Sequence, residues 1–186
     1  MSHTTHNIIT EVKLISFFFV LTIVILPRLV LGFSPVIENT PETHLKISKI
    51  GVNAVIENMG VTPDGAMAVP NNNTDVGWYS FGTRPGEIGS AVIGAHNLFN
   101  SKPGVFALLS ELKKGDVLSV TDTDGTSIYF IVRDIRTYNA LDTDTGIFES
   151  VDGGIHLNLI TCSGAWDPKT KSHTKRLVIF TDAVQA

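Results

Sequence analysis

The chain contains little cysteine and little charge, and each shortage excludes a class of protein. Cys162 is the one cysteine in 186 residues, so the chain forms no internal disulfide and has too few thiolates for a cysteine-built zinc site. Charged residues make up 17% of the chain and the pI is near 5.8, which argues against a general nucleic-acid-binding protein. A hydrophobic fraction of 43% excludes a wholly disordered chain.

The apolar residues are concentrated near the N-terminus. Residues 14–26 carry no charge, and after Pro27 and Arg28 the apolar sequence resumes over residues 29–33. This uncharged run has the length of a signal-peptide core, whereas a spanning helix needs about 20 residues. We predict that residues 1–33 form an apolar helix that is retained as a single-pass membrane anchor. A cleaved signal and a buried core helix are the alternatives.

The rest of the chain has the length of one domain. Residues 34–42 are polar, contain two prolines and are expected to form a linker, which leaves residues 43–186 as the domain. Either an anchor or a signal would place this domain outside the cytoplasm, at the cell membrane if the anchor is retained.

The domain has the pattern of an all-β protein. Strands are predicted where short runs are rich in β-branched and aromatic residues: Leu45–Ile50, Val52–Ile56, Ser90–Ala95, Val117–Thr121, Ser127–Ile135, His156–Thr161 and Arg176–Thr181. Asp124-Gly125 is typical of a hairpin turn. Val105–Lys114 alone has a helical pattern, about three turns long. Seven or eight closely spaced strands with one or two short helices predict a closed barrel or a sandwich.

The single cysteine is a candidate nucleophile. Cys162 follows the predicted strand His156–Thr161 and precedes Ser163-Gly164, which would place its sulfur at the rim of a sheet. The alternative is a small buried apolar residue, the usual role of a lone cysteine. An unpaired thiol outside the cytoplasm is exposed to oxidants, so its presence there favours a reactive role.

A thiol nucleophile needs an acid–base partner. His96 follows the strand Ser90–Ala95 and is ranked above His173, which falls in the predicted loop 169–175. His156 lies about 20 Å from Cys162 along the same extended strand, too far for proton transfer. Arg176 would lie beside Cys162 if the last two strands pair as a hairpin, where it could stabilise an oxyanion. The alternative for Arg176 is a solvated salt-bridge residue.

Three motifs then occur in the order and spacing of a known family. Asn158-Leu159-Ile160-Thr161-Cys162 resembles the T-L-x-T-C signature of sortases, with Asn in place of the first Thr. Ser90–His96 resembles the segment that leads to the sortase histidine, with Ala95 in place of the usual Gly. Lys175–Ile179 resembles the last strand, which bears the arginine. The resemblance covers about residues 44–183 and is greatest to the class E or F branches, and it implies a closed sortase-type barrel.

The resemblance also implies a reaction. Cys162 would attack a backbone carbonyl in a sorting signal of the Leu-Pro-x-Thr-Gly type, His96 would transfer protons, and Arg176 would stabilise the oxyanion. Thr161 would contact the substrate. The partners would be surface proteins that bear the signal, and an amine of a cell-wall precursor or a pilin; no cofactor and no nucleic acid are expected.

Three alternatives stay open. Acidic residues of the segment Thr137–Gly154, which include Asp142 and Asp144, lie where some sortases bind calcium, but they lack further ligands and are better explained as a solvated loop. The domain could be a catalytically idle, membrane-tethered module that binds peptide or wall polymer. It could also be a cysteine peptidase of another fold, which would hydrolyse its substrate without an amine acceptor.

Overall fold

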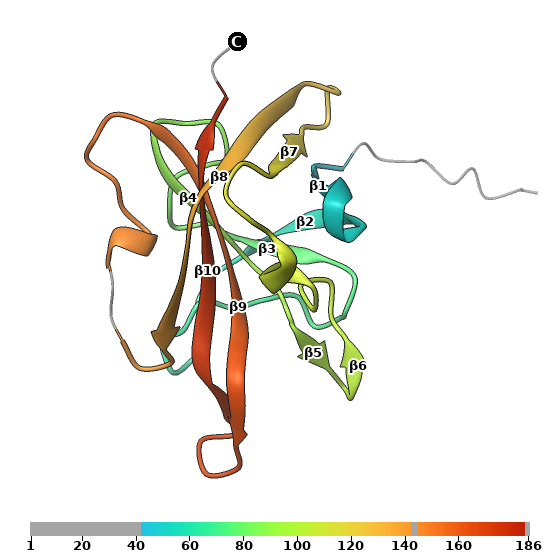
Figure 1. The fold of residues 1–186 in the computed structure, drawn as a ribbon, viewed down its shortest axis with the longest axis vertical. Helices are drawn as coiled ribbons and strands as arrows, with labels where there is room; N and C mark the ends of the chain where they lie inside the picture. Colours follow the sequence, from blue (N-terminus) through green and yellow to red (C-terminus); the bar gives the residue numbers. More distant parts are fainter. Residues whose placement is uncertain (1–41, 143–144, 185–186) are drawn as a thin grey trace, which may run out of the picture. The chain divides into compact units, whose positions relative to one another are not determined.

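Eight strands close into one barrel in the computed structural model, which describes residues 42–142 and 145–184 (Figure 1). The barrel strands are β1 (His44–Ile47), β2 (Val52–Met59), β3 (Val76–Tyr79), β4 (Gly89–Gly94), β7 (Val117–Thr121), β8 (Ser127–Asn139), β9 (Ile155–Asp167) and β10 (Ser172–Ala183). Their order around the barrel is β1-β2-β3-β4-β9-β10-β8-β7, and pairing of β1 with β7 closes it. The predicted closed all-β barrel is confirmed.

The barrel interior is filled by alternate residues of its strands. Leu157 and Leu159 of β9, Ile93 of β4 and Ile179 of β10 are fully buried there. Removal of one such side chain from water contributes about 1.5–3 kcal/mol. Because successive side chains of a strand point to opposite faces, the residues between them lie on the outer face of the barrel.

The predicted helix over Val105–Lys114 is wrong. The segment forms turns and one short 3₁₀ helix, η2 (Leu109–Glu111). Its buried residues Phe106, Leu109 and Leu112 are spaced three apart, which is the 3₁₀ period, whereas Leu108 is exposed. The other helices of the described residues are also 3₁₀: η1 (Ser48–Ile50) and η3 (Thr145–Ile147).

The last two strands extend well beyond their predicted ends. β9 continues past Cys162 to Asp167, and β10 begins at Ser172, so His173 lies in a strand rather than a loop. The pairing contains a bulge near Gly164, whose φ of 75° suits a glycine. Cys162 therefore lies within a long two-stranded ribbon and not at a strand end.

Two hairpins project from the same end of the barrel (Figure 1). One is the distal part of the β9–β10 ribbon, and the other is the short pair β5 (Leu98–Phe99) and β6 (Lys102–Pro103). The space between them is the smaller of the two cavities described below.

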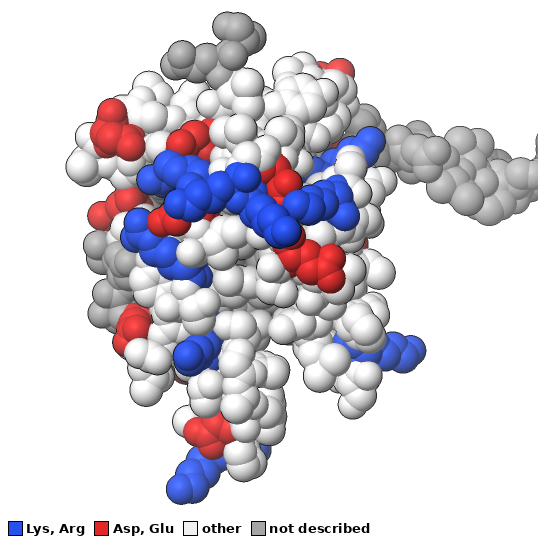
Figure 2. All heavy atoms as spheres, viewed as in Figure 1, with Lys and Arg blue, Asp and Glu red and all other residues white. Residues whose placement is uncertain are grey.

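Figure 2 shows a band of Lys and Arg side chains across the visible face, with acidic side chains between them. The arginines of β8 in this part of the barrel are paired: Arg133 with Asp182 at 2.9 Å, and Arg136 with Asp134 at 2.8 Å. Hydrogen bonds from Arg136 and then Lys114 lower the pKa of Asp134 to about 2. These basic groups are thus neutralised within the protein.

The N-terminal predictions lie outside the described residues. This applies to the apolar helix of residues 1–33 and to the linker 34–42 except Glu42. Within residues 42–142 and 145–184, no helix has the length and apolar character needed to span a bilayer.

Candidate active site

A cavity of about 540 Å³ lies on the outer face of β9 and contains all three predicted catalytic residues in its lining. Cys162 and Ile160 of β9 border it, and the register partner of Cys162 across the β9–β10 ribbon is Arg176. His96, two residues after β4, borders it from the other side. The larger cavity thus joins the ends of three sequence motifs that are up to 80 residues apart.

A second cavity meets the first at the thiol. It has a volume of about 410 Å³ and lies between the two projecting hairpins, with Asn100 and Ser101 on one side and Trp166 and His173 on the other. Cys162 and His96 border both cavities, whereas Arg176 borders only the larger one. Cys162 is partly exposed and unpaired.

His96 is held in one orientation. Its Nε2 donates to the carbonyl of Pro70 at 3.1 Å, and its ring packs on Phe99 with centroids 4.7 Å apart. Burial lowers the pKa of His96 and outweighs the opposite effect of the Pro70 hydrogen bond. The ring is therefore neutral at neutral pH, and because Nε2 carries the hydrogen, Nδ1 holds the free lone pair.

Hydrogen bonds between β9 and the residues that follow β4 fix the spacing between His96 and Cys162. The amide of Asn97 donates to the carbonyl of Cys162 at 3.1 Å. The buried hydroxyl of Thr161 donates to the carbonyl of Ala95 at 2.8 Å. Thr161 borders the larger cavity, but its hydroxyl hydrogen is committed to this bond. Neither Asn97 nor Pro70 had a signal in the sequence, because Asn97 acts on a distant backbone carbonyl and Pro70 acts through its own carbonyl on a distant side chain.

Gly104 is required where the chain turns back against His96. A Cβ at this position would collide with the carbonyl of His96 and approach its Cβ to 2.9 Å. The turn is held by hydrogen bonds from Gly104 N–H to Asn97 and from Phe106 N–H to His96. The segment after β4 therefore packs closely against the backbone of His96.

Arg176 is oriented by its own strand. Its guanidinium donates to the carbonyls of His173 and Lys175, both at 2.9 Å, and to the hydroxyl of Ser172 at 3.0 Å. These three bonds hold the guanidinium in one orientation, and Arg176 borders the larger cavity. His173 borders only the smaller cavity, and its Nδ1 donates to the Gly164 carbonyl at 3.0 Å.

The segment between β8 and β9 forms one wall of the larger cavity through Ile147 and Phe148. Asp142 accepts hydrogen bonds from Asn139, and Asp152 binds His156, so both carboxylates already have protein partners. Within the described residues no three potential metal ligands gather. Asp144 lies outside those residues, so the expectation of a loop without calcium stays a prediction.

The sequence profile of the sortase domain matches residues 45–184, nearly all of the described chain. The chain therefore belongs to the sortase family, the cysteine transpeptidases. No curated protein sequence is significantly similar to it.

Solved sortases share the fold. Sortase C-1 from Actinomyces oris is 24% identical, with 78% of this chain and 76% of that chain covered and a TM-score of 0.59. Sortase D5 from Clostridium perfringens is 23% identical, with 78% and 79% covered and a TM-score of 0.59. Sortase C1 from Streptococcus agalactiae is 22% identical, with 81% and 71% covered and a TM-score of 0.61. The predicted family is confirmed; the class E or F branch stays a prediction.

Proposed function

We propose that the chain is a membrane-anchored sortase that cleaves a Leu-Pro-x-Thr-Gly-like signal and transfers the protein to an amine of the cell wall or of a pilin. The observation that carries this proposal is that Cys162, His96 and Arg176 border one cavity in a member of the sortase family. Residues 1–33 would supply the anchor and place the domain outside the cytoplasm.

The larger cavity suits the acyl donor. Met67, Val69, Ile147 and Phe148 give it apolar walls that would accept the leucine and proline of the signal. Arg176, the register partner of Cys162, borders this cavity, where its charge would stabilise the oxyanion of a substrate carbonyl and orient the peptide backbone.

The first half-reaction forms a thioacyl-enzyme. Neutral His96 takes the thiol proton of Cys162 at Nδ1 as the sulfur attacks the signal's carbonyl carbon, which gives a tetrahedral oxyanion. Collapse of this intermediate breaks the peptide C–N bond, and the imidazolium of His96 gives its proton to the departing amine. The acyl group is then held on sulfur, and the C-terminal fragment leaves.

The second half-reaction uses the smaller cavity. An incoming amine there would reach the thioester next to His96, which removes the ammonium proton as the new amide forms and the thiol is regenerated. Because Cys162 and His96 border both cavities, donor and acceptor can approach the same carbon from different sides. Water at this position would give slow hydrolysis.

The test is product analysis with the full-length chain in detergent. A sorting-signal peptide is incubated with or without an oligoglycine or a lysine-bearing peptide, and the products are identified by mass spectrometry. We expect a conjugate of the N-terminal fragment with the amine, formed faster than the hydrolysed fragment. If the peptide is hydrolysed at the same rate with and without the amine and no conjugate forms, the chain is a peptidase instead. An intact peptide would identify an idle binding domain.

A further inference from the structure

The wall of the larger cavity is held in place by the outer face of β9. We use the term wall segment for residues 145–154, which begin with η3 and lead into β9. Ile147 of the wall segment is buried against Val92, Val178 and Phe180, and Phe148 packs beside it. Because Ile147 and Phe148 also line the cavity, the position of the wall segment determines the width of the donor groove.

Asn158 is one anchor of the wall segment. It lies on the same face of β9 as Ile160 and Cys162, because alternate residues of a strand share a face. Its side chain is 1% exposed, and its amide donates to the carbonyl of Ile147 at 2.6 Å. This is the position at which the sequence departs from the sortase signature. A threonine hydroxyl is one bond closer to the backbone and would not span the same gap.

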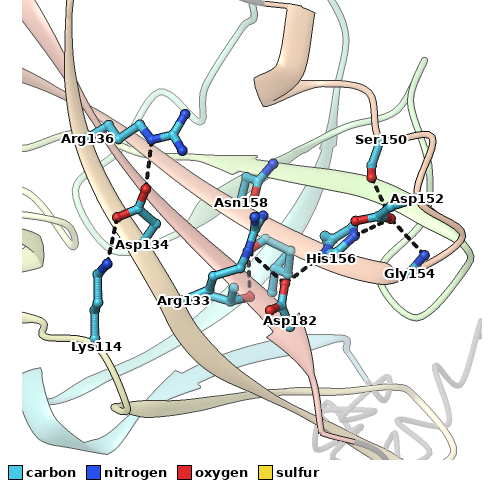
Figure 3. A network of polar contacts seen from close by, with 12 residues as sticks. Lys114, Arg133, Asp134, Arg136, Ser150, Asp152, Gly154, His156, Asn158 and Asp182 are labelled. Carbon is cyan, nitrogen blue, oxygen red and sulfur yellow. Dashed lines mark hydrogen bonds and ion pairs between the residues drawn. The ribbon is translucent and has the colours of Figure 1, made fainter.

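His156 is the second anchor, two residues earlier on the same face. Figure 3 shows its ring between Asp152 of the wall segment and Asp182 of β10. The Nε2–Asp152 distance is 2.9 Å, and the Nδ1–Asp182 distance is 2.8 Å. A carboxylate can only accept, so the protonated ring, with hydrogen on both nitrogens, satisfies both contacts at once. Asp152 also accepts from Ser150 and from Gly154 N–H, which extends the anchor along the wall segment.

We propose that Asn158 and His156 are positioning residues that set the donor groove by anchoring the wall segment, so that they control affinity for the donor peptide and not the chemical step. This inference rests on the proposed function. Neither residue lines the cavity, and each reaches the groove through its contact with the wall segment.

The charged groups around His156 give the inference a pH signature. Asp152 faces it from the wall segment and Asp182 from β10; Arg133 of β8 pairs with Asp182, and the register partner on β4 is the uncharged Ser90. Burial opposes the charged ring, but the two carboxylates outweigh it and raise the pKa of His156 above its ordinary 6.5. The hydrogen bond from His156, and then those from Gly154 and Ser150, lower the pKa of Asp152.

The direction of the pH effect follows from these shifts. A raised pKa means that the imidazolium anchor is complete below pH 6.5 and is lost as the pH rises through the folded-state pKa. The pKa of His96 is lowered instead, so His96 titrates below pH 6.5. The two histidines can therefore be separated in a pH profile.

The experiment measures binding and kinetics in matched variants. In a Cys162→Ala background, Asn158→Thr and His156→Gln should each weaken binding of a fluorescent sorting-signal peptide by about five- to tenfold, the scale of one lost hydrogen bond. In the active enzyme, Asn158→Thr should raise KM with kcat unchanged. Amide hydrogen exchange of residues 145–154 should become faster in both variants. The Kd of the parent should rise above pH 6.5 as His156 deprotonates, and this rise should be absent in His156→Gln.

Thr181→Val is the matched control. The Thr181 hydroxyl is also buried and also donates at 2.6 Å to a carbonyl, but that carbonyl belongs to Leu157 and not to the wall segment. We expect its peptide affinity to equal that of the parent. Equal affinity in Asn158→Thr, His156→Gln and Thr181→Val would overturn the inference while the proposed function stands. A parent that binds no sorting peptide would overturn both.

Discussion

The two faces of β9 differ in what a substitution should change. On the inner face, Leu157 and Leu159 are fully buried in the barrel core. On the outer face, the alternate residues are His156, Asn158, Ile160 and Cys162, which anchor the wall segment, line the cavity and supply the thiol. From His156 to Ile160, the strand thus separates core residues from groove residues by alternation, because the pleat directs neighbouring side chains to opposite sides.

Among variants that keep the nucleophile, the largest effect is expected at Arg176, the outer-face partner of Cys162 across the ribbon. Arg176→Ala should lower kcat by about 100- to 1000-fold, the usual cost of removing an oxyanion donor. Its melting temperature should stay close to that of the parent, because the guanidinium bonds only to nearby groups of its own strand. Arg176→Lys keeps the positive charge but loses the two-pronged guanidinium, so its kcat should lie between those of Arg176→Ala and the parent. The measurement is steady-state kinetics with a quenched peptide. A kcat of Arg176→Ala equal to that of the parent would contradict this role.

Substitutions on the inner face of β9 should change kcat less than Arg176→Ala does, but they should lower the free energy of unfolding more. Leu159→Ala should lower the free energy of unfolding by about 2–5 kcal/mol and leave kcat per folded molecule unchanged. The matched variant is Ile160→Ala on the outer face, which should raise KM and destabilise less, because Ile160 is only partly buried. Denaturant unfolding and kinetics on both proteins test the contrast. Equal losses of stability with equal KM values would remove the distinction between the faces.

Several strands could be predicted from short runs of β-branched and other apolar residues. These runs located β4, β7 and the central part of β9, and the three motifs identified His96, Cys162 and Arg176, which border one cavity in the structure. The distal ribbon could not be predicted in the same way. From Ser163 to His173 no apolar alternation exists, and the pairing there depends on the backbone ladder and on the Gly164 bulge.

Other features depend on contacts that no local pattern contains. Phe106, Leu109 and Leu112 fit an α-helical face and a 3₁₀ turn almost equally well, and only the exposure of Leu108 separates the two. Pro70 and Asn97 act on His96 and on the Cys162 carbonyl across long sequence separations. The Asn158 departure from the signature was visible in the sequence, but its meaning required the position of the Ile147 carbonyl.

The central claim is that Cys162 carries the acyl group, and the most direct test is the intact mass of the enzyme mixed with a sorting-signal peptide in the absence of an amine acceptor. We predict a mass increase equal to the N-terminal fragment of the peptide. Digestion should locate it on Cys162, and Cys162→Ala should show neither the adduct nor the cleaved peptide while keeping the parent's unfolding transition. Cleavage by Cys162→Ala, or an adduct on any other residue, would contradict the account.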